Sequence, residues 1–99
     1  MTEAVADPRT EQEVRQTIRE IVAEVAPEGT DDDVSSTMHL VDDLAFHSLS
    51  LLELAFTLED EFDLPPIDED IARSIVIVAD VEQHVVDELA GRGELAAAQ

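Results

Sequence analysis

The stretch from residue 48 to 62 carries the strongest helical pattern in the chain. One apolar stripe recurs at intervals of three and four residues, which is the spacing of one helix face, and comprises Leu51, Leu54, Ala55, Leu58 and Phe62. A second stripe lies about 140° around the helix at 100° per residue, and comprises Leu49, Leu52 and Phe56. Because one stripe is enough to pack a helix into a bundle, the second must be covered by another segment or left for a ligand or partner.

A first helix precedes this stretch. It is expected to begin between Pro8 and Thr10, where Thr10 and Glu13 have the spacing of a capping box. Pro27 and Gly29 are expected to end it. Its inward face is predicted to consist of Val14, Ile18, Ile21, Val22 and Val25.

Two further helices follow the proline pair Pro65-Pro66, which must break the helix before it. A short one is predicted from Asp68 to about Ser74, and a last one from about Val78 to Ala90, with Gly91 as its stop. The run 75–78 has strand-like composition, but no second strand is available to pair with it. We therefore predict an apolar linker there.

A long loop, residues 27–47, joins the first two helices, and loops of this length are usually functional or disordered. Its apolar residues are expected to pin it across the core: Met38, Leu40, Val41, Leu44 and Phe46. The acidic run 31–33 lacks the glycine and terminal glutamate of an EF-hand loop, so we predict no metal site. The sequence predicts an all-α fold, a small four-helix bundle with three longer helices, a short third helix and a long first loop. Residues 8–90 form the domain, between flexible tails 1–7 and 91–99.

The charge is strongly negative: five basic against twenty-five acidic residues, 5 − 25 = −20. Such a surface repels nucleic acid and anionic membranes, whose binding requires Lys and Arg, and it attracts partners with basic patches. There are no cysteines for disulfides or thiolate metal sites. No apolar run is long enough to cross a bilayer, and no secretory signal is evident. We expect a cytoplasmic monomer.

Ser48 opens the central helix and admits three interpretations. A serine at a helix start often caps it. A catalytic serine would need a base and an oxyanion site, but His47 is only a sequence neighbour and no G-x-S-x-G is present. His39 and His84 lack partners at metal-ligand spacing. The third interpretation is covalent modification, because a helix N-terminus tolerates a phosphoryl group and the preceding loop gives access.

Residues 44–62, L-A-F-H-S-L-S-L-L-E-L-A-F-T-L-E-D-E-F, resemble the motif of the acyl carrier proteins, in which a Ser-Leu pair opens the second helix. The similarity extends over about residues 10–90. It implies a non-enzymatic bundle with a 4′-phosphopantetheine arm on Ser48, transferred from coenzyme A by a phosphopantetheinyl transferase. It further implies acyl thioesters on the arm, and loading enzymes, synthases and acyltransferases of fatty-acid or polyketide type with basic docking surfaces.

Two features depart from that family. Acyl carriers usually have an aspartate where this chain has His47, and a histidine there is more typical of peptidyl carriers. Ala45-Phe46 replaces the usual glycine before the serine. An aminoacyl or peptidyl carrier therefore stays open as an alternative, as does an acidic docking bundle without a cofactor.

The resemblance also implies a docking surface around the second helix. Its predicted residues are Asp43, Leu49, Leu52, Glu53, Phe56, Glu59 and Asp60, with Glu61 beside them. Leu49 is expected to guide the arm and Phe56 to line the path into the bundle. His47 is expected to contact the phosphate of the arm.

Overall fold

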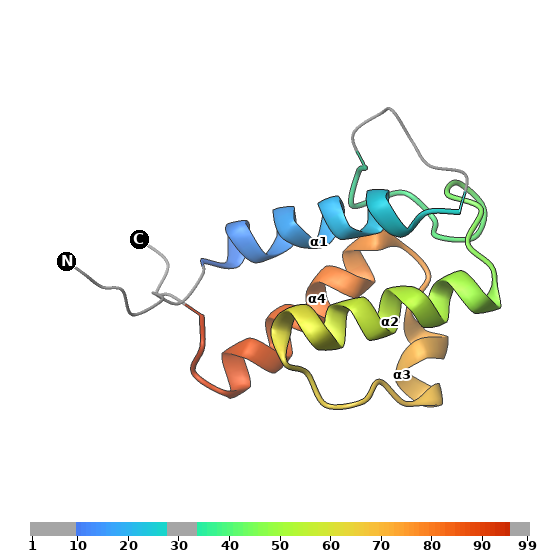
Figure 1. Cartoon of the computed structure of the whole chain (residues 1–99). Helices are drawn as coiled ribbons and strands as arrows, with labels where there is room; N and C mark the ends of the chain where they lie inside the picture. Colours follow the sequence, from blue (N-terminus) through green and yellow to red (C-terminus); the bar gives the residue numbers. More distant parts are fainter. Residues whose placement is uncertain (1–9, 28–33, 96–99) are drawn as a thin grey trace.

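The computed structural model describes residues 10–27 and 34–95. Four helices make up this part of the chain: α1 (Glu11–Val25), α2 (Ser48–Phe62), α3 (Glu69–Ser74) and α4 (Val78–Gly91). Figure 1 shows α1, α2 and α4 lying alongside one another, with the short α3 beside the first half of α2. The predicted all-α four-helix bundle is confirmed. The predicted tail 1–7 and the acidic run 31–33 lie outside the described residues.

Helix α1 begins where its capping box predicts. The Thr10 hydroxyl accepts a hydrogen bond from the Glu13 N–H at 3.1 Å, and the Glu13 carboxylate accepts one from the Thr10 N–H at 2.9 Å. These two bonds satisfy donors that the first helical turn leaves without intrahelical partners. Thr10 is therefore the N-cap of α1.

The core forms where α1 packs against α4 and α2. Val14, Ile18 and Val22 of α1 and Val78 and Val85 of α4 have no exposed surface. The long loop contributes Leu40, Leu44 and Phe46 to this core, as predicted, and Met38 is half-buried against it. The prediction for Val41 is wrong, because its side chain is 57% exposed.

A buried carboxylate ties α1, the loop and α4 together. Glu82 is 1% exposed, and its oxygens lie 3.1 Å from Arg15 Nη1 and 3.2 Å from Arg19 Nη1. The Ser36 hydroxyl donates to the same carboxylate at 2.7 Å. Burial by itself would lower the pKa of Arg15, but hydrogen bonds and charge from Glu11 and Glu82 raise it overall. This polar side of α1 therefore also packs against α4.

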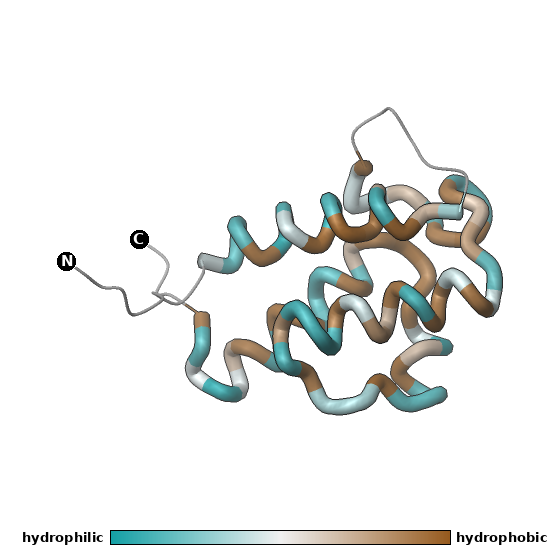
Figure 2. The backbone as a smooth tube through the Cα atoms, viewed as in Figure 1, coloured by the Kyte–Doolittle hydropathy of each residue, from teal (hydrophilic) through white to brown (hydrophobic). Residues whose placement is uncertain are grey.

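The linker before α4 makes one short strand-like contact. His39 and Ile77 form an isolated antiparallel bridge, with hydrogen bonds from Leu40 N to Val76 O and from Val78 N to Met38 O, both 3.0 Å. The sequence predicted no pairing partner for this run, and the loop supplies one. Figure 2 shows apolar residues continuing from this linker into the first turn of α4.

The C-terminal end of α4 also differs from the prediction. Gly91 is the last helical residue rather than the stop, and Gly93 takes the left-handed turn at φ 70°. The Arg92 guanidinium donates to the Phe62 and Asp63 carbonyls at 2.8 and 2.6 Å, so it caps the C-terminus of α2. Residues 91–95, assigned to a tail, thus belong to the bundle.

Candidate functional site

Two serines at the start of α2 have different environments. His47 is the N-cap, with extended φ and ψ of −128° and −179°, and Ser48 is the first residue of α2. The hydroxyl of Ser50, which is 2% exposed, accepts from the His47 N–H at 2.8 Å and lies 3.0 Å from the His47 carbonyl. Ser50, and not Ser48, therefore makes the side-chain hydrogen bonds to the N-cap of α2.

Ser48 is exposed. Within the described part of the chain, no hydrogen bond joins its hydroxyl to another group, and the backbone N–H groups of residues 48–50 have no backbone acceptor. Such N–H groups carry the positive end of the helix dipole and favour an anion. A phosphodiester on Ser48 fits this position, because nothing has to be displaced and the adjacent charge is favourable.

The turn before Ser48 contains a left-handed alanine. Ala45 has φ 61°, a conformation in which a Cβ is unfavourable and glycine is preferred. The sequence shows Ala45-Phe46 where the family it resembles usually has glycine. The structure shows that Ala45 adopts a conformation suited to glycine, at a cost in strain.

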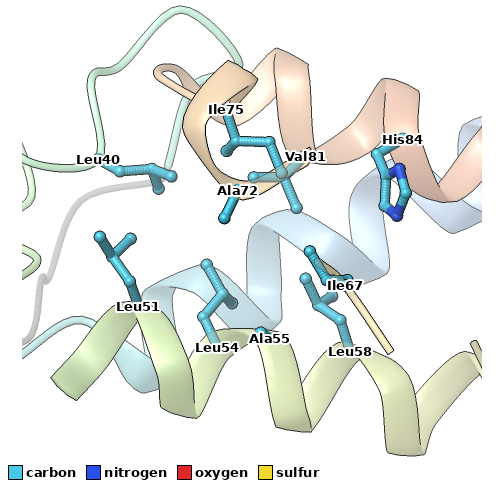
Figure 3. Close-up of a pocket in the computed structure, with 10 residues that line it drawn as sticks. All are labelled: Leu40, Leu51, Leu54, Ala55, Leu58, Ile67, Ala72, Ile75, Val81 and His84. Carbon is cyan, nitrogen blue, oxygen red and sulfur yellow. The ribbon is translucent and has the colours of Figure 1, made fainter. Parts of the chain in front are cut away.

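An apolar pocket of about 80 Å³ lies between α2, α3 and α4. Figure 3 shows its α2 wall facing side chains from α4 and from the segment that contains α3. The lining residues are Leu40, Leu51, Leu54, Ala55, Leu58, Ile67, Ala72, Ile75, Val81 and His84. A single water molecule needs roughly 10–15 Å³ of such space. The pocket therefore has room for a short apolar chain.

The pocket begins on the flank of α2 that bears Ser48. Leu51 and Ala55 follow Ser48 by three and seven residues, so all three lie along one side of the helix. At 1.5 Å of rise per residue, Leu51 lies about 4.5 Å and Leu58 about 15 Å along the axis from Ser48. A group attached to Ser48 therefore has a direct route along α2 to the pocket.

The second apolar stripe of α2 is outside this route. Leu49, Leu52 and Phe56 are 63%, 49% and 58% exposed, so neither the loop nor α3 covers them. The expectation that Phe56 lines the path into the bundle is wrong, because Phe56 is absent from the pocket wall and Leu51 and Ala55 take that place.

The predicted acidic docking residues divide into two groups. Asp43 accepts from the His39 N–H at 2.8 Å, and Glu59 accepts from the Ile67 N–H at 3.0 Å, so both stabilise loops. Glu53 and Asp60 are exposed, and their carboxylates make no hydrogen bond or ion pair with another described residue. Glu61 is exposed beside them.

The described arginines make contacts within the molecule. Arg15 and Arg19 pair with Glu82, Arg92 caps α2, and Arg73 lies 3.5 Å from Glu69 on α3. None of them lies on the outer face of α2, which is therefore acidic and apolar.

Sequence reasoning missed Ser50 and the pocket residue His84. Ser50 stands three residues after His47, the spacing of a reciprocal cap, which was the available signal. His84 follows Val81 by three residues, which places it at the edge of the inward face of α4. In the described residues no three His, Cys, Asp or Glu side chains gather as a metal site would require, and no helix has the length and apolar composition to cross a membrane.

Residues 16–85 match a family model described as a phosphopantetheine attachment site. The chain is 38% identical, over 69 residues, to an acyl carrier protein of Desulforapulum autotrophicum, covering 69% of this chain and 87% of the relative. Among solved structures it resembles the acyl carrier protein of Enterococcus faecalis, with TM-score 0.64 and 29% identity over 80% of this chain and 98% of the other. A Mycobacterium tuberculosis protein assigned as an acyl carrier gives a TM-score of 0.58 and 38% identity, covering 78% of this chain and 95% of the other.

Proposed function

Because the chain belongs to the phosphopantetheine-attachment family of acyl carrier proteins, which are carriers and not enzymes, we propose that Ser48 is its attachment residue. The observation that carries this assignment is the contrast at the start of α2. Ser50 is buried and hydrogen-bonded, whereas Ser48 is exposed with no hydrogen bond among the described residues. Of these two hydroxyls, a modifying enzyme can reach only that of Ser48 without disturbing the start of α2.

The surroundings of Ser48 suit the phosphate of the group. The N–H groups of the first turn, residues 48–50, have no backbone acceptor in the described chain, and the positive end of the helix dipole there complements the charge of an anion. The exposed imidazole of His47 stands at the N-cap beside them and adds a hydrogen-bond donor. When bound, the group supplies a long arm whose terminal thiol holds an acyl chain as a thioester.

The pocket supports an acyl cargo of fatty-acid or polyketide type. Its walls are almost entirely apolar, and they start on the flank of α2 that carries Ser48. Burial of an apolar chain there is favourable by roughly 0.8 kcal/mol per CH₂. A hydrophobic enclosure of this kind serves a hydrocarbon chain better than it serves a charged aminoacyl group, whose burial is costly.

Partner enzymes are proposed to dock on the outer face of α2. Leu49, Leu52 and Phe56 form an exposed apolar strip, bordered by the free carboxylates of Glu53 and Asp60. Interfaces commonly combine an apolar centre with a charged rim, and the rim steers partners of opposite charge. Asp43 and Glu59 are proposed to act indirectly, by fixing the loops at each end of this face.

The assignment is tested by incubating the protein with coenzyme A and a broad-specificity phosphopantetheinyl transferase, followed by intact-mass measurement. Wild type and Ser50→Ala are expected to gain one arm each, and Ser48→Ala none. Modification of Ser48→Ala would overturn the site. Loading of the arm by acyltransferases rather than by amino-acid-adenylating enzymes is expected; the reverse result would make the chain an aminoacyl or peptidyl carrier.

A further inference from the structure

The pocket contains one side chain that a purely apolar cargo does not require. Among the residues that line it, His84 alone carries a polar group. Figure 3 shows its imidazole extending from α4 toward the part of the pocket where Leu58 and Ile67 lie. The residues around it are aliphatic, so the wall offers the imidazole no hydrogen-bond partner.

His84 also has no partner elsewhere in the described chain. Its side chain is half-buried, and no hydrogen bond or ion pair joins it to a described residue. A neutral imidazole has one donor and one acceptor nitrogen. A polar group in apolar surroundings is costly unless it is hydrogen-bonded. An oxygen on the cargo would therefore be stabilised at this position, and a fully saturated chain would leave the imidazole unpaired.

The place of His84 along the pocket indicates which part of the cargo it meets. Leu51 marks the end of the pocket nearer Ser48, and Leu58, about 10 Å farther along the α2 axis at 1.5 Å per residue, marks the end where His84 lies (Figure 3). A chain that enters from the Ser48 side brings its distal atoms to His84. The thioester end stays nearer Leu51.

We propose that His84 is a specificity residue that favours acyl groups with a hydroxyl or carbonyl oxygen near the distal end of the chain. This inference rests on the proposed acyl-carrier function. A site with a hydrogen-bonding group discriminates strongly against analogues that lack the matching oxygen, since binding them leaves the protein group unpaired.

The test uses the protein loaded at Ser48 with three chains of equal length: octanoyl, 3-hydroxyoctanoyl and 7-hydroxyoctanoyl. Pocket occupancy is measured from the NMR shifts of the Leu58 and Ile75 methyl groups, and the melting temperature is measured in parallel. The ratio of inserted to solvent-exposed chain is expected to be roughly 2- to 10-fold higher for 7-hydroxyoctanoyl than for octanoyl, the size of one net hydrogen bond.

Three variants isolate the imidazole. His84→Leu is expected to reverse the preference in favour of octanoyl, and His84→Gln to retain it in part. His39→Leu removes a histidine outside the pocket and is expected to leave the preference unchanged. Circular dichroism and the melting temperature of each unacylated form establish that the variants fold.

The outcomes separate this inference from the proposed function. An octanoyl preference in wild type, an equal or higher occupancy for 3-hydroxyoctanoyl, or a preference that survives His84→Leu would each overturn the role of His84 while leaving Ser48 as the attachment site. Absence of any arm on Ser48 would instead refute the proposed function itself.

Discussion

The two sides of the bundle differ in how they use apolar residues. On the seam, where α1 meets α4, Val14, Ile18, Val22 and Val85 are completely buried, and Glu82 joins the helices by ion pairs. On the pocket side, α3 has no buried residue and a cavity remains against α2. Close packing is thus concentrated away from the pocket. Under the proposed function, the looser packing on the pocket side is what leaves room for an acyl chain.

A large loss of stability is expected from breaking the seam with Glu82→Ala. This change leaves Arg15, Arg19 and the Ser36 hydroxyl without their shared acceptor. Removal of one partner from a buried ion pair costs about 3–5 kcal/mol, and urea unfolding should show a loss at the lower end because both arginines are partly exposed. Glu24→Ala removes one carboxylate from an exposed site. It should change the free energy of unfolding by less than about 0.5 kcal/mol.

A loss for Glu82→Ala no larger than that of Glu24→Ala would mean that the Glu82 ion pairs do not stabilise the seam. Comparison of these two variants also separates the local effect of Glu82 from the general relief of negative charge. Each variant removes one carboxylate from a chain whose net charge is −20.

The same substitution on each side sharpens the comparison further. Ile18→Ala on the seam should cost about 2–5 kcal/mol, because a fully buried side chain leaves a cavity in close packing. Ile75→Ala in the pocket wall should cost about 1 kcal/mol, since this side chain is half-buried and already borders empty space. Urea midpoints of both variants provide the measurement, and equal losses would mean that the pocket side is packed as tightly as the seam.

A smaller contrast is expected between the two serines of α2. Ser50→Ala removes a buried hydroxyl that bonds both backbone groups of His47, and should cost about 1 kcal/mol. Ser48→Ala should leave the melting temperature almost unchanged, because the Ser48 hydroxyl has no described partner. Destabilisation by Ser48→Ala of the same size would show that Ser48 is a structural cap.

The smallest expected change is a gain. Ala45→Gly relieves a left-handed alanine, which is disfavoured by roughly 1–2 kcal/mol, while the freer unfolded chain of glycine offsets up to about 1 kcal/mol of this. Thermal unfolding should show a net stabilisation of about 0.5 kcal/mol. A clear destabilisation would mean that the Ala45 methyl group makes a contact that outweighs its strain.

The sequence predicted much of this structure because its local signals are strong. The bounds of α2 agree with the prediction at both ends, and Leu54, Leu58 and Phe62 are buried as their spacing requires. Periodicity located the second stripe but left open whether another segment covers it, and the structure shows that it is exposed.

The remaining features depend on contacts between distant parts of the chain. Burial of Glu82 depends on arginines that lie 63 and 67 residues away, and its own neighbourhood in α4 gives no sign of them. The strand-like run at Ile77 has its partner at His39, in a loop without periodicity. Whether Ser48 or Ser50 caps α2 depends on the extended conformation of His47, which propensity does not determine.

The bridge at His39 and Ile77 has a further consequence for protein engineering. It brings Leu40 and Val76, the two ends of a continuous segment, within one backbone hydrogen bond of each other. That segment contains Ser48, all of α2 and α3, and most of the pocket wall. Segments whose two ends lie close together are easier to exchange, because both junctions fall at one place in the fold. Residues 40–76 are thus a natural cassette for exchange between carriers, while α1 and α4 remain as the frame that receives it.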